Sequence, residues 1–428
     1  MELIYLLEKP EEDRVNEIIK KVGQENLFFY SAFDFDEKTN IERFCKVFKS
    51  GTLKEASSFL RNEVKLDKTN ILIKNFERLF SKSDTSIIDF VFSLKDTNAK
   101  IYLLSKDTDK ANDLIENYLK DVITKVDKEK RINFFDNITK KQESFVYYSI
   151  FGTNSRYIKS IDNTKSIKEN IINLILKKDA EFRNEPERIM KEDLRTLSVY
   201  NKILMVIAKG ADTLNTIAEK MDMTTSTCNK YLNVLVSQKV LRKEKSLYET
   251  DTKQSKYIID NNLFRFYYYF IPDNANILEL EKYEDVYNNI EENFDKFLQK
   301  TFVDICGDYI SKLADENKIK LDIKEEGAFW DKQSKIDLIK GDSLTSCVAD
   351  CYYREDLVGI KAFEMLKNNA KKLDVADRKY YLFSKNGFTE DLKKLAKNSD
   401  ELNLVTFDEM FESKEQKSKR LFFFNKKG

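Results

Sequence analysis

Residues 195–260 carry the pattern that most constrains the fold of this chain. Apolar residues recur at helical spacing over about 199–208, in TLNTIAEKM, and from TTSTCNKYLNVLVSQ onward. Gly210 separates the first two stretches, and a tight turn at Asp222-Met223 separates the last two. A mostly basic run at 242–245 and a short apolar strand follow. Helices joined by a tight turn and followed by a two-stranded ribbon predict a winged helix-turn-helix.

The second of the paired helices has a start suited to DNA contact. Thr224 or Thr225 is predicted to cap it, because a hydroxyl accepts one of the free N–H groups of the first turn. No acid occurs between 224 and 238, and short polar side chains suit base edges and phosphates. We therefore expect DNA contacts from this helix and the ribbon, at Thr224, Thr225, Ser226, Asn229, Lys230, Arg242, Lys243 and Lys245. The alternative is a helical hairpin used for packing or protein contacts.

Composition limits the other possibilities. The 428 residues suffice for two or three domains, and Lys plus Arg equals Asp plus Glu at 74 each, so a DNA site must be a local patch. Histidine is absent, which excludes Ser-His-Asp and Cys-His catalysis and His-bearing zinc sites. No stretch reaches the ~18 apolar residues of a membrane span. Five scattered cysteines fit reduced thiols, so a cytoplasmic location is expected.

Residues 1–150 alternate short apolar stretches with amphipathic ones. LIYLL, NLFFYSAF, NILIKNF and KIYLLSKD read as strands, and the segments between them read as helices. Such alternation predicts an α/β domain with a mostly parallel sheet, whose ligand sites would lie at the carboxyl ends of the strands.

The order of these elements, and several segments downstream, resemble one family. FGTNSRYIKSID, LFRFYYYFI, FLQKTFVDICGDYI and FSKNGFTEDLKKLA match in type and spacing the archaeal-type P-loop ATPases (AAA-like, STAND). Members of that family join an ATPase domain to a winged helix and a C-terminal PD-(D/E)XK nuclease-like domain. The resemblance implies an α/β multidomain chain: a P-loop-type domain at 1–150, a helical connector at 151–194, a winged helix at 195–272, a nuclease-like, restriction-endonuclease-type domain at 273–412 and a tail at 413–428.

The ATPase motifs themselves are missing. None of the ten glycines begins a Gly-Lys-Ser or Gly-Lys-Thr, and the loop after LIYLL reads EKPEEDR, whose acids would repel a triphosphate. Lys74-Asn75 stands where the family has the acidic pair that holds Mg²⁺. We therefore expect neither ATP hydrolysis nor a required cofactor.

The nuclease-like segment keeps part of the family's acidic set. By position, the resemblance assigns Asp304 on a helix, Asp337 in SKIDLI and Asp350 in VADCYY to the three carboxylates. Tyr352 stands at the lysine position, and Lys361 on the next helix is a candidate substitute. Such acids bind a divalent metal that activates water, so Asp337 and Asp350 are the candidate Mg²⁺ ligands.

Together these observations favour a DNA-associated pseudo-ATPase that binds duplex DNA through its winged helix and whose nuclease-like domain is inactive. One alternative is an enzyme, either an ATPase of this family or a Mg²⁺-dependent nuclease built on Asp304, Asp337 and Asp350. A second alternative is a scaffold that contacts another protein. A membrane partner is not expected.

Overall fold

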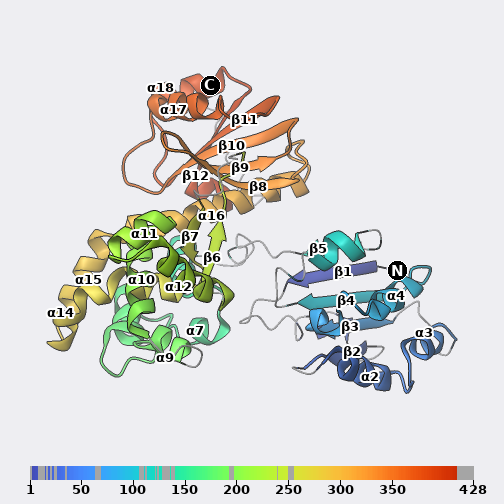
Figure 1. The fold of residues 1–428 in the computed structure, drawn as a ribbon. Helices are drawn as coiled ribbons and strands as arrows, with labels where there is room; N and C mark the ends of the chain where they lie inside the picture. Colours follow the sequence, from blue (N-terminus) through green and yellow to red (C-terminus); the bar gives the residue numbers. More distant parts are fainter. Residues whose placement is uncertain are drawn as a thin grey trace. The chain divides into compact units, whose positions relative to one another are not determined.

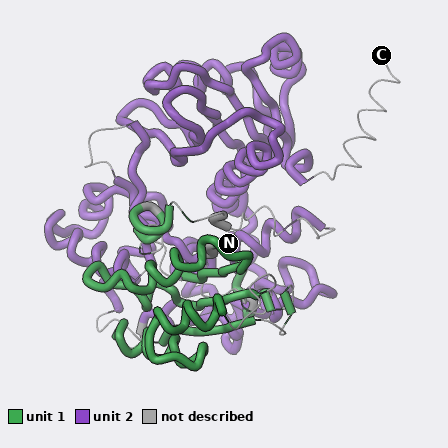
Figure 2. Tube along the Cα trace, turned by 90° about the vertical axis from the view of Figure 1, so that its right-hand side faces the viewer, with its two compact units in different colours: residues 1–129, 153–156 green, residues 130–152, 157–428 purple. Residues whose placement is uncertain are grey.

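A computed structural model describes most of the chain, in two compact units (Figures 1 and 2). The described residues are 2–7, 15, 18–19, 22–23, 27–33, 36–62, 69–105, 110, 113–120, 122, 125–127, 135, 140–191, 197–238, 240–248 and 255–411. The loop EKPEEDR and the tail 413–428 lie outside them. Unit 1 comprises residues 1–129 and 153–156, and unit 2 comprises 130–152 and 157–428. The first boundary therefore falls about twenty residues before the one expected from the sequence, and the segments expected downstream share one compact unit.

Unit 1 is built on a parallel sheet, as the alternating pattern predicts. Its strands are β1 (Glu2–Leu7), β2 (Leu27–Ser31), β3 (Asn70–Lys74), β4 (Lys100–Ser105) and β5 (Lys125–Asp127). Their order is β2-β3-β4-β1-β5, and every adjacent pair is parallel.

Helices cover one face of this sheet and bury its alternate residues. They are α2 (Glu37–Val47), α3 (Leu53–Asn62) and α4 (Ser86–Ser93), with short turns at Phe76–Leu79 and Ile115–Leu119. Phe44 and Leu60 from the helices pack with Ile73 and Leu103 from the strands in one core. On the other face Leu72, Tyr102 and Leu104 form a smaller cluster with Ile18.

Unit 2 begins with a helical region that includes the segment expected to form a helix-turn-helix. Its helices are α6 (Lys141–Phe151), α7 (Ser155–Lys159), α8 (Ile167–Ile171, continued to Leu176), α9 (Glu185–Lys191), α10 (Leu197–Ala208), α11 (Leu214–Lys220) and α12 (Thr225–Ser237). The antiparallel ribbon of β6 (Leu241–Glu244) and β7 (Lys256–Ile259) follows. Asp222 lies in the left-handed region with φ 50°, which makes the tight turn between α11 and α12.

Aromatic helix α13 (Asn262–Phe270) joins this region to the next one. Phe264, Phe266, Tyr268 and Phe270 are all buried, so these aromatics fill the core. After it come α14 (Ala275–Glu279), α15 (Tyr283–Glu292) and the long α16 (Phe294–Asp315).

A mixed five-stranded sheet completes unit 2. Its strands are β8 (Glu325–Trp330), β9 (Lys335–Gly341), β10 (Thr345–Tyr352), β11 (Asp377–Ser384) and β12 (Leu402–Thr406), and its helices are α17 (Ile360–Ala370), α18 (Glu390–Lys397) and α19 (Phe407–Phe411). The order is β12-β11-β10-β9-β8, with β8, β9 and β10 antiparallel and β10, β11 and β12 parallel. Helix α16 packs on one face, while α17 and α18 pack on the other. This sheet is separate from that of unit 1.

Candidate nucleic-acid interface

Helix α12 begins and turns as its sequence predicts. Thr227 N donates a hydrogen bond of 3.2 Å to Thr224 Oγ1, so Thr224 is the cap. Cys228, Leu232 and Leu235 are fully buried along one side of the helix. That side packs against α11 and β6, and the opposite side is left to the solvent.

The solvent side of α12 is polar and free of acids. Thr224, Thr225, Ser226 and Lys230 are exposed, and Asn229 is half-buried. Asn233 is also exposed, one turn beyond Lys230. The sequence analysis did not select Asn233, although its helical spacing from Ser226 and Lys230 would have identified it.

Two of the three expected ribbon cations face solvent. Lys243 and Lys245 are exposed, and Lys243 Nζ lies 5.7 Å from the centroid of the Tyr257 ring. Lys245 makes no ion pair within the described part of the chain. Lys243 lies on β6, the strand that packs on the buried side of α12, and Lys245 directly follows that strand.

Arg242 does not fit its expected role as a phosphate contact. Its Nε and Nη2 donate to Glu244 Oε1 at 2.9 and 2.6 Å, and its Nη1 donates to Asp260 Oδ1 at 2.6 Å. Two carboxylates therefore already hold the guanidinium, and a phosphate would have to displace them.

The loop that follows β6 is bound to the edge of the C-terminal sheet. Ser246 Oγ accepts from Trp330 N and donates to Trp330 O, both at 2.8 Å, and Leu247 N donates to Ala328 O at 2.9 Å. Gly327 allows this approach, since a Cβ there would lie 3.0 Å from Leu247 Cγ. The ribbon is thus joined to β8.

Asp337 and Asp350, from neighbouring strands, form a carboxylate pair. Asp350 Oδ1 accepts from Asp337 N at 3.2 Å, and Asp337 Oδ2 accepts from Cys351 N at 3.1 Å. Burial, and then the charge of Asp337, raise the pKa of Asp350 to about 7. Sequence reasoning placed these two acids in register, and the structure brings them together.

A lysine does reach this pair, but from a position that the sequence analysis did not select. Lys335 Nζ lies 2.6 Å from Asp337 Oδ1, and both residues belong to β9. Tyr352 stacks under Arg354, whose guanidinium carbon is 4.9 Å from the ring centroid. Lys361, the candidate substitute, is exposed on α17 and makes no ion pair among the described residues.

Asp304 is engaged with cations rather than with the other two acids. Lys300 Nζ lies 2.9 Å from Asp304 Oδ1, one helical turn away on α16. Burial lowers the pKa of Arg265 to about 10, while the Asp304 carboxylate opposes that shift. Asp304 and Asp337 line the same cavity of about 370 Å³, together with Lys245. Within the described residues no three side chains of His, Cys, Asp or Glu are grouped closely enough to hold a metal, so the three acids do not form the expected site.

Unit 1 has one carboxylate near the place where the ATPase acids would lie. Lys74 ends β3 and Asn75 follows in the left-handed conformation, with φ 55°. Glu77 is buried just beyond, and Ser105 Oγ at the end of β4 donates to Glu77 Oε2 at 2.6 Å. Glu77 was not among the residues predicted from the sequence, because the family's acidic pair aligns with positions 74 and 75. The loop 8–14 of this edge lies outside the described residues.

A family model matches part of the C-terminal half of the chain. Residues 267–372 match the DUF234 family, described as archaea bacterial proteins of unknown function. The chain is also 26% identical over 162 residues to the uncharacterized protein MJECL04 of Methanocaldococcus jannaschii. That match covers 38% of this chain and 36% of the relative, so the chain spans about a third of the relative's length.

Similarity to solved structures is weak. A chain of the Drosophila ORC bound to AT-rich DNA and Cdc6 aligns with 62% of this chain and 84% of its own length, at 8% identity and a TM-score of 0.22. Protein VC1899 from Vibrio cholerae aligns over 99% of this chain and 98% of its own, at 10% identity and a TM-score of 0.22. Among the described helices none has the length and apolar character to cross a bilayer.

Proposed function

We propose that this protein binds duplex DNA through helix α12 and the ribbon that follows it. The order of three helices, α10 to α12, and an antiparallel ribbon is that of a winged helix-turn-helix. The observation that carries the proposal is the solvent face of α12. Its exposed Thr225, Ser226, Lys230 and Asn233 form a polar stripe with a positive charge and no acid. Such a stripe at the start of the second helix suits the major groove.

Lys243 and Lys245 supply the phosphate contacts in this proposal. Both are exposed, Lys243 on β6 and Lys245 directly after it, and in this proposal the backbone of a duplex bound to α12 reaches them. Arg242 has a different role, since its ion pair to Asp260, the residue after β7, joins the two strands of the ribbon, while its pair to Glu244 lies within β6. The proposed interface therefore has three cations, Lys230, Lys243 and Lys245. We expect the salt dependence of the binding constant to correspond to the release of at most about three counterions.

Unit 1 is proposed as a domain that does not hydrolyse ATP. Lys74-Asn75 at the end of β3 offers no carboxylate pair for a magnesium-bound triphosphate. This inference predicts that the chain releases no phosphate from ATP in the presence of Mg²⁺.

Binding to a duplex of about 25 base pairs, measured by fluorescence anisotropy over a salt series, tests the proposal. Lys230→Ala, Lys243→Ala and Lys245→Ala are each expected to weaken binding severalfold and to lower the salt slope by about 0.9. Lys361→Ala, an equal change of charge on α17, is the matched control and should leave both quantities unchanged. Absence of salt-dependent binding by the intact chain would overturn the proposal and favour a scaffold for another protein.

Phosphodiester hydrolysis is the second candidate, and the Asp337–Asp350 pair with Lys335 beside it is the observation in its favour. Asp304 is held by Lys300 instead of completing a metal site, so the donor set does not fit the expected Mg²⁺. The same binding samples, with Mg²⁺ present, can be scored for strand cleavage. Cleavage that Asp337→Ala abolishes would establish the nuclease in place of the inactive domain proposed here.

A further inference from the structure

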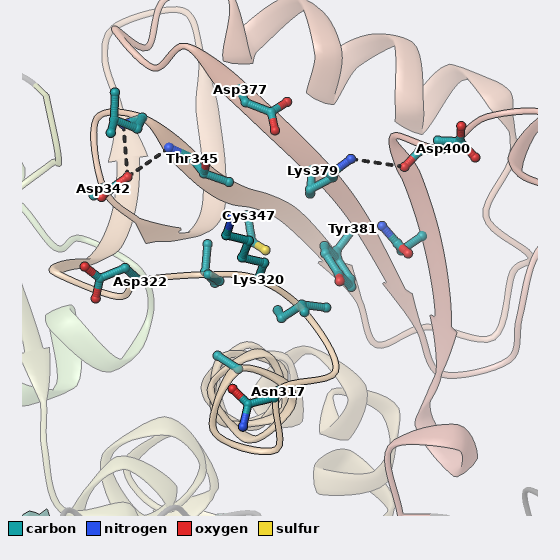
Figure 3. Close-up of a pocket in the computed structure, with 15 residues that line it drawn as sticks. Asn317, Lys320, Asp322, Asp342, Thr345, Cys347, Asp377, Lys379, Tyr381 and Asp400 are labelled. Atoms are coloured by element: carbon teal, nitrogen blue, oxygen red, sulfur yellow. Dashed lines mark hydrogen bonds between the residues drawn. The ribbon is translucent and has the colours of Figure 1, made fainter.

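A broad groove lies on the C-terminal sheet, on the face that α16 covers only in part (Figure 3). Its volume is about 870 Å³, within the size range of small-molecule sites. Helix α16 ends at Asp315, so the first residues of β10, β11 and β12 are left without a helix above them. The segment that follows α16 forms the opposite wall, with Ile319, Lys320 and Leu321.

The floor combines apolar and polar side chains because alternate strand residues share a face. Cys347 of β10 and Tyr381 of β11 are almost fully buried at the bottom. Lys379 is two residues before Tyr381 and therefore lies on the same face.

Three hydrogen-bond donors of this groove are left for a ligand. Lys320 makes no ion pair or hydrogen bond in the described part of the chain, and Figure 3 shows it extending across the groove toward Cys347. Lys379 Nζ has one long contact, 3.5 Å to the backbone oxygen of Asp400. The hydroxyl of Tyr381 donates to no group among the described residues. Two ammonium groups and a phenol lining one groove favour an anionic group.

The carboxylates of the groove divide into two kinds. Asp342 accepts from the backbone N of Leu344 and Thr345 at 3.0 and 2.8 Å. Asp342 and Asp322 share one cation, since Lys324 Nζ lies 3.3 Å from a carboxylate oxygen of each. Asp377 and Asp400 have no side-chain partner among the described residues, and both lie at the edge of the groove (Figure 3). Both carboxylates are exposed and can accept hydrogen bonds from hydroxyl or amino groups of a ligand.

We propose that this groove binds a nucleoside phosphate. The phosphate would lie between Lys320 and Lys379, and the base would pack on Ile319 and Leu321. Asp377 and Asp400 would accept hydrogen bonds from ribose hydroxyls or from base amino groups. A simple anion would leave these two acids unused, and an uncharged nucleoside would leave the lysines unused. The site is distinct from α12, so it stands or falls independently of DNA binding.

Isothermal titration of the full chain with AMP, GMP, CMP and UMP tests this inference, with inorganic phosphate and the four nucleosides as separate arms. At least one monophosphate is expected to bind at least tenfold more tightly than phosphate or its own nucleoside. Lys320→Ala combined with Lys379→Ala should weaken that binding at least tenfold, and Lys361→Ala should not change it. Lys320→Glu alone, at an exposed side chain, gives a second variant that retains the fold.

Three outcomes would overturn the inference. The first is absence of binding by every monophosphate. The second is binding that survives in both lysine variants, which would place the ligand elsewhere in the chain. The third is phosphate or nucleoside binding as tightly as the monophosphate, which would assign a different ligand class. DNA binding by the same variants is expected to stay unchanged, so the two proposals can fail separately.

Discussion

Replacing Asp350 by asparagine should stabilise unit 2, and the gain should depend on pH. The substitution keeps an oxygen that can accept the hydrogen bond from Asp337 N, and it removes the negative charge beside Asp337. Burial and that neighbouring charge raise the pKa of Asp350 from 3.8 to about 7. The folded state therefore holds a proton that the unfolded state has released between about pH 4 and pH 7.

The sign follows from this difference in bound protons. Where the folded state binds more protons than the unfolded state, stability falls as pH rises. The wild type should therefore lose stability from about pH 4 to pH 7, and Asp350→Asn should lose less over the same range. The shift corresponds to about 4 kcal/mol at most, since one pKa unit is about 1.4 kcal/mol. Lys335, 2.6 Å from the Asp337 carboxylate, offsets part of the repulsion, so we expect a gain on the order of 1–3 kcal/mol at pH 8.

The assay can follow the correct unit, because the chain contains one tryptophan, Trp330 on β8. Urea unfolding monitored by its fluorescence at pH 4.5, near the lower end of the shifted range, and at pH 8, above it, gives the free energy of unfolding of both proteins. Asp356→Asn, at an exposed position, is the control and should shift neither curve. Equal stabilities of Asp350→Asn and wild type at pH 8, or a larger gain at the acidic pH, would refute the electrostatic reasoning.

Two further predictions concern stability. Gly341→Ala should cost at least about 3 kcal/mol by urea unfolding followed at Trp330, since φ is 150° and the new Cβ would lie 2.2 Å from Thr345 O; a cost below about 1 kcal/mol would contradict this local geometry. Asn40→Ala should cost unit 1 about 1–3 kcal/mol, because the buried amide accepts from Phe33 N and donates to Phe33 O, each at 3.1 Å. Amide hydrogen exchange of β2 and β3 measures the loss, and unchanged protection there would show that the network contributes nothing.

The sequence predicted those parts of the fold that depend on local periodicity. The parallel strands of unit 1, the extents of α10 to α12 and the capping role of Thr224 all follow from spacing within a few residues. The compact units divide near residue 130 and not near 150, because α6 packs with α13, whose residues come more than a hundred positions later in the sequence.

The ion pair between Arg242 and Glu244 could have been predicted from the sequence. Residues two apart in a strand point to the same side, so Arg242 and Glu244 were bound to be neighbours once β6 was predicted as a strand. Asp260 could not be added by the same reasoning, since its position beside Arg242 depends on the register that pairs Leu241 with Ile259. The sequence of residues 242–245 therefore suggests more free positive charge on the ribbon than the structure leaves, because Arg242 is paired with carboxylates.

The same alternation explains why Lys335 was missed at the carboxylate pair. The family resemblance predicts a lysine two residues after Asp350, a position that Tyr352 occupies. It gives no reason to select Lys335, two residues before Asp337. Each position is two residues from one of the paired acids along its strand, and the lysine that reaches the pair is Lys335. Asp304 shows the opposite case, because its partner Lys300 lies one helical turn away and was already visible as a helical i, i+4 pair.

The attachment of the ribbon to β8 connects the proposed DNA interface with the Asp337–Asp350 carboxylate pair. Ser246 and Leu247 hydrogen-bond to the backbone of β8, and β8 pairs with β9, which carries Asp337. Lys245, immediately before this loop, lines the cavity that also contains Asp337. A DNA phosphate bound by Lys245 would therefore lie next to Ser246 and Leu247, which are hydrogen-bonded to β8, and β8 pairs with the strand that carries Asp337. If DNA binds as proposed, the fluorescence of Trp330 should change on binding. Unchanged Trp330 fluorescence on DNA binding would show that the ribbon moves independently of the sheet.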